Sequence, residues 1–135
     1  MAARGVRNNN PLNIEYRRGQ HWRGQSVNQV DGRFVQFDTM TDGLRAAFVV
    51  IRNYFCLHRL NNLQQIIYRW APPSENVSRA YLAYVVQESG VSPSEPLRWT
   101  QRSRICAIVK AMAMLESNIT FSDQDLEYAY RLACL

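Results

Sequence analysis

The feature that most constrains this fold is a helical spacing of apolar residues, which begins at Thr39 and continues to the C-terminal end. Apolar side chains recur three and four positions apart, and this spacing places them on one face of an α-helix. The pattern predicts helices over residues 39–55, 61–70, 76–89 and 100–115, and a last helix that starts at Ser122. Pro72-Pro73 is expected to end the second helix. The helix over 100–115 is the most apolar, so we expect it at the centre of the core.

Residues 1–38 lack this spacing and are expected to be irregular. The Asn-Asn-Asn-Pro run at 8–11 favours a turn, because asparagine tolerates left-handed backbone angles and proline fixes φ. Asp31-Gly32 suits a tight turn between short extended segments, which predicts a small N-terminal β-hairpin over about 22–37. The expected fold class is therefore mostly α (α+β), a single domain over residues 1–135 with about five helices and this hairpin.

The charge and hydropathy of the chain limit its partners. The net charge of +5 favours polyanions, but the arginines are spread along the chain without a dense basic run. A nucleic-acid-binding role would rest on this charge alone, and we expect no nucleic-acid partner. The first residues lack the apolar stretch of a secretory signal, and no apolar run reaches the ~18 residues that cross a bilayer. We expect synthesis in the cytoplasm without a signal peptide, and no membrane insertion.

No motif of the chain points to a metal or a nucleotide. His21 and His58 lie far apart in sequence, and neither belongs to an HExxH or CxxC motif. A glycine-rich phosphate-binding loop is also missing. We therefore expect no metal and no cofactor, which leaves carboxylates and aromatic side chains to carry any chemistry.

Glu116 is the first candidate for a catalytic group. It stands at the C-terminal end of the most apolar helix, between core residues and a polar loop. Partial burial favours the protonated form of a carboxyl group, and a general acid needs this form near neutral pH. Glu75 is the second candidate, although acidic residues are also common at the start of a helix, where Glu75 stands.

Aromatic faces and amide groups are typical of sugar-binding sites. Tyr16, Tyr81 and the asparagines of the N-terminal loop could supply them. Trp22 lies in a polar loop and is the better tryptophan candidate, whereas Trp70 falls on the apolar face of a helix and is expected to be packed in the core.

Five segments of the chain resemble a phage and bacterial family of virion structural proteins and lysins, which is similar to the lytic protein of cystoviruses. The matching segments are 7–14, Trp22-Arg23-Gly24, 32–39 with its two phenylalanines, 43–46 and Trp70-Ala71-Pro72-Pro73-Ser74-Glu75-Asn76. The resemblance implies a lysozyme-like domain. Lysozyme-like glucosaminidases and lytic transglycosylases carry a catalytic glutamate at the end of an apolar helix, followed by an asparagine-containing loop.

The order of these parts is different in this chain. The asparagine loop opens the chain and the helix that ends in Glu116 closes it, as a circular permutation of the lysozyme-like arrangement would give. On this basis the resemblance assigns catalysis to Glu116, and Glu75 is the candidate for the second carboxylate that a hydrolase would need. It assigns substrate binding to Asn8, Asn9, Asn10, Asn13, Tyr16, Trp22, Ser74, Asn76 and Tyr81.

The chain also departs from the family pattern. Asn118 replaces a common glycine, Val77 replaces a common acidic residue, and Glu15 stands where arginine is common. These departures leave reduced or altered activity open.

The expected function is cleavage of the MurNAc–GlcNAc β-1,4 bond of peptidoglycan, by a lytic transglycosylase or a muramidase. The alternatives are a peptidoglycan endopeptidase and a non-catalytic virion or wall-binding module. Peptidoglycan strands are the expected substrate, and we expect a monomer. The resemblance implies action in the periplasm or cell wall after delivery by a virion, a holin or a secretion system, with delivery machinery or an immunity protein as further partners.

Overall fold

The computed structural model describes residues 3–71 and 74–135, and this part of the chain is mostly helical. The five predicted helices are confirmed as α2 (Met40–Cys56), α3 (Leu63–Trp70), α4 (Glu75–Ser89), α5 (Arg102–Ser117) and α6 (Asp123–Ala133). A short helix that the sequence did not predict, α1 (Arg4–Arg7), precedes them. The helix end predicted at Pro72-Pro73 lies outside the described residues. None of the described helices is long and apolar enough to cross a membrane.

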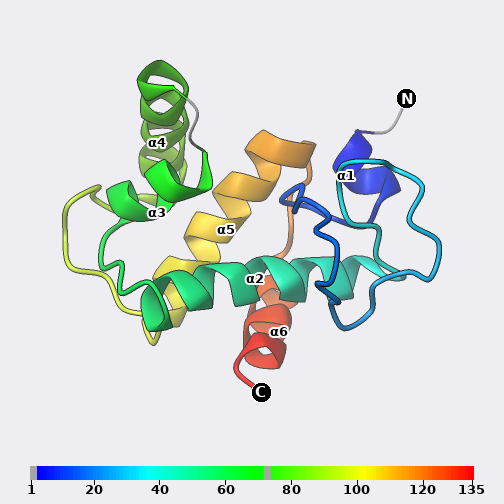
Figure 1. Ribbon diagram of the computed structural model, residues 1–135. Coiled ribbons are helices and arrows are strands. Elements are labelled where there is room, and N and C mark those ends of the chain that lie inside the picture. Colours follow the sequence, from blue (N-terminus) through cyan, green and yellow to red (C-terminus); the bar gives the residue numbers. More distant parts are fainter. Residues whose placement is uncertain (1–2, 72–73) are drawn as a thin grey trace.

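Helix α5 is the centre of the packing, as its apolar sequence predicted. It packs against α4, α6 and α1, while α2 packs against α6 and α3 against α4 (Figure 1). Its inner face is fully buried at Ile105, Ile108, Val109 and Met112. In Figure 1, α3 and α4 lie on the left and most of the N-terminal loop segment lies on the right, with α5 running between them.

Side-chain caps fix where most of these helices begin. Thr39, Asn62, Ser74 and Ser122 each accept a hydrogen bond from the backbone N–H three residues later. Such caps satisfy a donor that has no partner inside the helix. At the other end of α4, Gly90 has a φ of 73°, the left-handed angle that stops a helix and favours glycine.

The predicted N-terminal β-hairpin is wrong. In place of two paired strands the described residues hold two isolated antiparallel bridges, Glu15–Phe34 and Gln25–Phe37. Side chains take the positions that a strand ladder would use: the Gln29 amide donates to the Gln36 carbonyl and accepts from the Gln36 backbone N–H, both at 2.8 Å. The result is a loop held by amide side chains. The Asp31-Gly32 motif predicts a tight turn between strands and gives no indication of these side-chain hydrogen bonds.

Asp31 holds this loop to the start of the chain. Its carboxylate accepts two hydrogen bonds from the Arg4 guanidinium, at 2.6 and 2.7 Å, and one from Asn8 at 2.9 Å. The backbone N–H groups of Arg33 and Phe34 also donate to it. The Arg4 guanidinium and these other donors hold the pKa of Asp31 well below its ordinary value.

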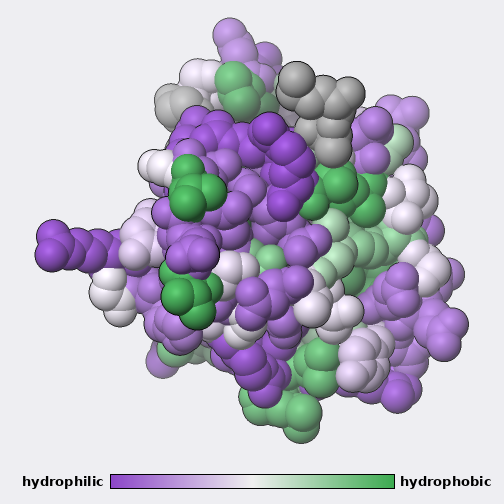
Figure 2. All heavy atoms as spheres, turned by 90° about the vertical axis from the view of Figure 1, so that its right-hand side faces the viewer, coloured by the Kyte–Doolittle hydropathy of each residue, from purple (hydrophilic) through white to green (hydrophobic). Residues whose placement is uncertain are grey.

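The surface of this end of the molecule is mostly hydrophilic, with isolated hydrophobic residues on it (Figure 2). Val27 and Val30 are 99% and 79% exposed. Residues 1–60 carry nine arginines against four acidic residues, whereas residues 61–135 carry seven basic and seven acidic residues. The whole excess of positive charge therefore belongs to the first 60 residues.

Asn10 is the buried polar centre of the N-terminal segment. Its side chain is fully buried and donates to the carbonyl oxygens of Ile14 and Val35, at 3.0 and 2.8 Å, while it accepts from the Ile14 N–H at 2.9 Å.

We expect Asn10→Ala to lower the free energy of unfolding by about 3 kcal/mol or more, because three buried groups lose their partner. Urea unfolding measures this change. The matched variant Asn76→Ala, at an exposed position, should change it by less than about 0.5 kcal/mol; equal effects would contradict this account of Asn10.

Asp31 gives the protein a predictable sensitivity to acid. Because its pKa is lowered on folding, the unfolded chain binds the proton more readily, so this stabilisation is present above the unfolded pKa and is lost as pH falls below about 4. Asp31→Asn should be less stable at pH 7 and should show a shallower fall in stability between about pH 5 and pH 2. Urea unfolding at a series of pH values tests this, and parallel curves for the two proteins would refute it.

Candidate active site

Glu116 accepts hydrogen bonds from three segments that are remote from it in sequence. It lies in the last turn of α5 with its side chain half-buried. Its Oε2 accepts from Trp70 Nε1 at 3.1 Å and from the Tyr81 hydroxyl at 3.0 Å. Its Oε1 accepts from Asn13 Nδ2 at 3.2 Å. The carboxylate is therefore held by one donor each from the N-terminal loop, α3 and α4.

The N-terminal loop reaches Glu116 because two asparagines adopt left-handed backbone angles. Asn13 has a φ of 54°, and its side chain donates to the Glu116 backbone carbonyl as well as to the carboxylate. Asn118, with a φ of 55°, ends α5 directly after the site. Between them, Ser117 Oγ donates to the Pro11 carbonyl at 2.7 Å. The asparagine loop and the end of the Glu116 helix are therefore in contact across more than 100 residues of sequence.

Tyr81 is a donor that stays protonated. Its side chain is buried, 8% exposed, in the core beside α5. Burial raises the pKa of its hydroxyl far above the ordinary value, and the Glu116 carboxylate raises it further. A neutral phenol therefore faces Glu116 at any physiological pH.

The two oxygens of the Glu116 carboxylate differ in how many hydrogen bonds they accept. Its donors are an indole, a phenol and an amide, and within residues 3–71 and 74–135 it has no ion pair with arginine, lysine or histidine. Oε2 takes two hydrogen bonds, whereas the Oε1 carboxylate oxygen takes one longer one from a side chain. Oε1 therefore has spare capacity to accept a hydrogen bond from a hydroxyl group of a bound molecule.

The comparison with known proteins finds a phage relative. No family model matches the chain. Protein P5 of Pseudoalteromonas phage PM2 is 35% identical to it over 118 residues, which are 86% of this chain and 72% of the phage protein. The chain belongs to the protein P5 family. This name describes no activity, so the lysin and lysozyme-like parts of the predicted resemblance stay predictions for this P5-family chain.

Within the described residues of this P5-family chain, Glu75 shares no hydrogen-bond partner with Glu116. It is the exposed first residue of α4, and it accepts a hydrogen bond from the Tyr68 hydroxyl at 3.0 Å. Ser74 caps the same helix, and Asn76 accepts from Arg79 at 3.2 Å. All three residues therefore stand at the start of α4. Glu75 is about 9 Å from Tyr81 along the helix axis, because six residues separate them.

The first three asparagines of the predicted binding loop are used inside the fold. Asn8 donates to Asp31, and Asn9 donates to the Phe37 carbonyl at 3.1 Å. Asn10 is buried with its amide fully bonded. Of the four asparagines in the N-terminal loop that were predicted to bind substrate, the structure places Asn13 beside Glu116.

The predicted aromatic residues occupy different environments. Tyr16 is 44% exposed, and its backbone N–H donates to Arg33 in the bridged loop. Trp22 is half-buried and packs between the main core and a smaller apolar cluster formed by Ile14, Val35, Phe37 and Ala46. Its Nε1 is buried without a hydrogen-bond acceptor among the described residues. Trp70 is the residue that the sequence reasoning missed. A packed indole N–H requires a hydrogen-bond acceptor. The prediction that Trp70 is packed therefore already implied a polar group beside its ring.

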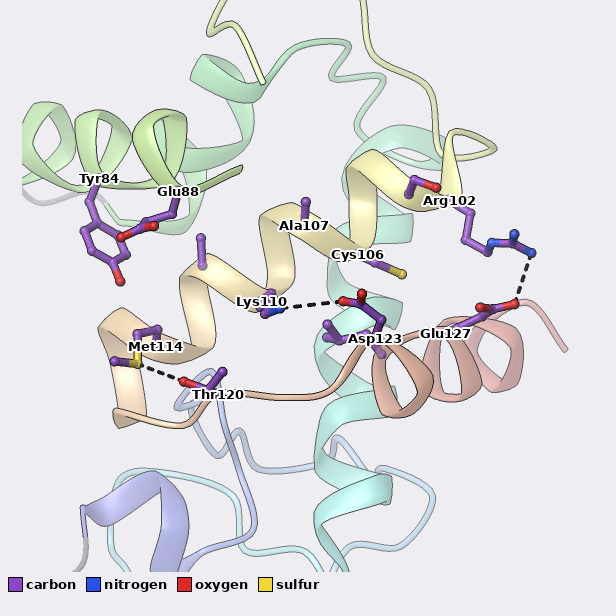
Figure 3. A pocket seen from close by; sticks show the side chains of 13 residues that line it. Tyr84, Glu88, Arg102, Cys106, Ala107, Lys110, Met114, Thr120, Asp123 and Glu127 are labelled. Carbon is purple, nitrogen blue, oxygen red and sulfur yellow. Dashed lines mark hydrogen bonds and ion pairs between the residues drawn. The ribbon is translucent and has the colours of Figure 1, made fainter. Parts of the chain in front are cut away.

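A groove on another side of the molecule holds no part of this cluster. It lies between α4, α5 and α6, has a volume of about 600 Å³, and is lined by Tyr84, Lys110, Met114 and Asp123 among others (Figure 3). Its acidic residues Asp123 and Glu127 pair with Lys110 and Arg102 at 3.6 and 3.4 Å. Burial raises the pKa of its Cys106 thiol to about 11, so this thiol is not a nucleophile near neutral pH.

The part of the chain that the structure describes contains no cluster of side chains that could bind a metal ion. No group of three histidine, cysteine, aspartate or glutamate residues is close enough there to hold an ion. The three cysteines are free thiols.

The bond between Tyr81 and Glu116 can be measured directly. Tyr81→Phe should lower the free energy of unfolding by about 1–2 kcal/mol, because it removes a hydrogen bond to a charged group and keeps the ring. In a Glu116→Ala background the same change should cost much less, and this difference is the coupling between the two side chains. Urea unfolding of the four proteins gives the value. Tyr128→Phe, at a position 58% exposed, is the control; no coupling would contradict the proposed contact.

Proposed function

We propose that this P5-family chain cleaves the β-1,4 bond between MurNAc and GlcNAc in peptidoglycan, with Glu116 as its general acid and base. The observation that carries the proposal is the half-buried Glu116 carboxylate with three neutral donors and an Oε1 that has one side-chain hydrogen bond. Such a group can give and take a proton beside aromatic side chains, which suits chemistry on a sugar.

The reaction needs two proton transfers through one oxygen. Protonated Oε1 donates its proton to the glycosidic oxygen as the bond from that oxygen to the sugar C1 breaks. The resulting carboxylate then takes the proton of the C6 hydroxyl of the same muramyl residue, whose oxygen forms the new bond to C1. The product is an anhydro sugar. The reaction consumes no water and requires no second carboxylate. This lytic transglycosylase route fits a site in which Glu116 has no carboxylate partner in contact.

The neighbours of Glu116 have separate roles in this proposal. Trp70 and Tyr81 fix Oε2, so the carboxyl group cannot rotate and Oε1 keeps one direction. Asn13 brings the N-terminal loop to the same oxygen that carries the proton. Pre-oriented groups of this kind lower the cost of reaching the transition state.

A hydrolase would use a second carboxylate, and Glu75 is the candidate. Retaining and inverting glycosidases both place two carboxyl groups at a defined separation. Because Glu75 is exposed and bonded to Tyr68, we favour the route with one acid.

Digestion of purified peptidoglycan by matched variants tests the proposal. We expect wild-type protein to release anhydro-muropeptides, detected by mass spectrometry. Glu116→Gln, which keeps the shape of the side chain, should reduce the rate about 100-fold or more. Glu75→Gln should keep most of the activity, and Glu15→Gln at an exposed position is the control.

Other products would identify the alternatives. Reducing-end sugars lost in both Glu116→Gln and Glu75→Gln would indicate a muramidase. New peptide ends without new sugar ends would indicate an endopeptidase. Binding of the cell wall without any soluble product, unchanged in Glu116→Gln, would indicate a wall-binding module, and each of these last two results would overturn the glycosidase proposal.

A further inference from the structure

A second cluster, formed by Tyr54, His58 and Arg69, lies next to the Glu116 site. The Arg69 guanidinium lies over the Tyr54 ring, 5.6 Å from its centroid, and its Nη2 is 3.4 Å from His58 Nε2. The Tyr54 and His58 rings meet edge to face at 6.1 Å. Arg69 and His58 are exposed, so the cluster presents a cation at the surface.

No carboxylate neutralises this cation from its own part of the chain. Residues 43–74 contain four arginines and not one aspartate or glutamate. Within the described residues Arg69 has a cation–π contact with Tyr54 and a polar contact with His58, and it forms no ion pair there. A guanidinium stacked on an aromatic ring keeps its edge free to bind a carboxylate with two hydrogen bonds.

The cluster is connected to Glu116 in two ways. Trp70, which donates to the Glu116 carboxylate, is the residue directly after Arg69 in the last turn of α3. Tyr54 lies near Tyr81, the second donor to Glu116: burial and Glu116 raise the pKa of Tyr81, and Tyr54 adds to this rise. Arg17 also lies near Tyr54, since it and Arg69 oppose the rise that burial causes in the pKa of Tyr54. Arg17 brings a second positive charge from the N-terminal loop.

We infer that Arg69, stacked on Tyr54, binds a carboxylate of the stem peptide on the muramyl residue whose bond Glu116 cleaves. This inference rests on the proposed function, and it adds a specificity residue to it. The glycan strand itself is uncharged where each lactyl group is linked to a peptide, so the negative charge of the substrate is in that peptide. An arginine beside a glycan-cleaving acid therefore distinguishes peptide-bearing strands from neutral sugar polymers.

Calorimetric binding tests the inference without turnover. The Glu116→Gln protein is titrated with a peptide-bearing tetrasaccharide from peptidoglycan, and with the same compound after its carboxylates are converted to carboxamides. We expect the amidated compound to bind about tenfold more weakly, because a carboxamide has no charge and keeps one of the two acceptor oxygens that the guanidinium edge would bind. Adding Arg69→Gln should weaken binding of the acidic compound by the same factor and leave binding of the amidated compound unchanged. Arg69→Lys, which keeps the charge, should lie between them.

Each further result has one meaning. Arg79→Gln, in an exposed part of α4, is the matched control and should bind both compounds as its parent does. Equal affinity for both compounds would overturn the inference and leave the proposed function standing, as would a loss for both compounds in Arg69→Gln. Binding of neither compound would overturn the proposed function together with the inference.

Discussion

The hydrogen bonds of the Glu116 carboxylate join parts of the chain that sequence separates. Asn13, Trp70 and Tyr81 reach it from the N-terminal loop, α3 and α4, and Glu116 itself ends α5. A buried or half-buried carboxylate without partners would be costly, so the positions of these segments depend on one another. Ser117 adds a further bond from α5 to the N-terminal loop. The arrangement explains why a loop without regular secondary structure keeps a defined place beside the helices.

Helices and their ends could be predicted because their signals are local. The apolar spacing and the caps at Thr39 and Ser122 indicate α2 and α6 within a few residues. The N-terminal region could not be predicted in this way, since its bonds run between side chains and backbone across long stretches of sequence. Gln29, Gln36 and Asp31 replace the ladder of a hairpin, and no period of two or turn motif reveals such pairs.

The candidate site was predicted in part. Glu116 and Tyr81 meet, and Asn13 joins them, as a site built from the helix end and the asparagine loop requires. Trp70 was assigned to the core because its helical position suggests packing, and its indole ring does pack there. Its N–H points to Glu116, and the direction of a single polar atom within a packed ring does not follow from the spacing of residues. Asn8 and Asn10 were predicted to bind substrate, but both residues are buried and their amides form hydrogen bonds that hold the N-terminal loop.

The central claim is that a glycan strand binds where Trp70, Asn13 and Glu116 meet. The most direct measurement is the NMR spectrum of ¹⁵N-labelled Glu116→Gln protein during titration with a peptidoglycan tetrasaccharide. The account predicts that the largest shifts occur at the Trp70 indole N–H and the Asn13 side-chain amide, with smaller ones at the end of α5. Shifts that gather instead in the groove between α4, α5 and α6, or the absence of any shift at saturating sugar, would contradict it.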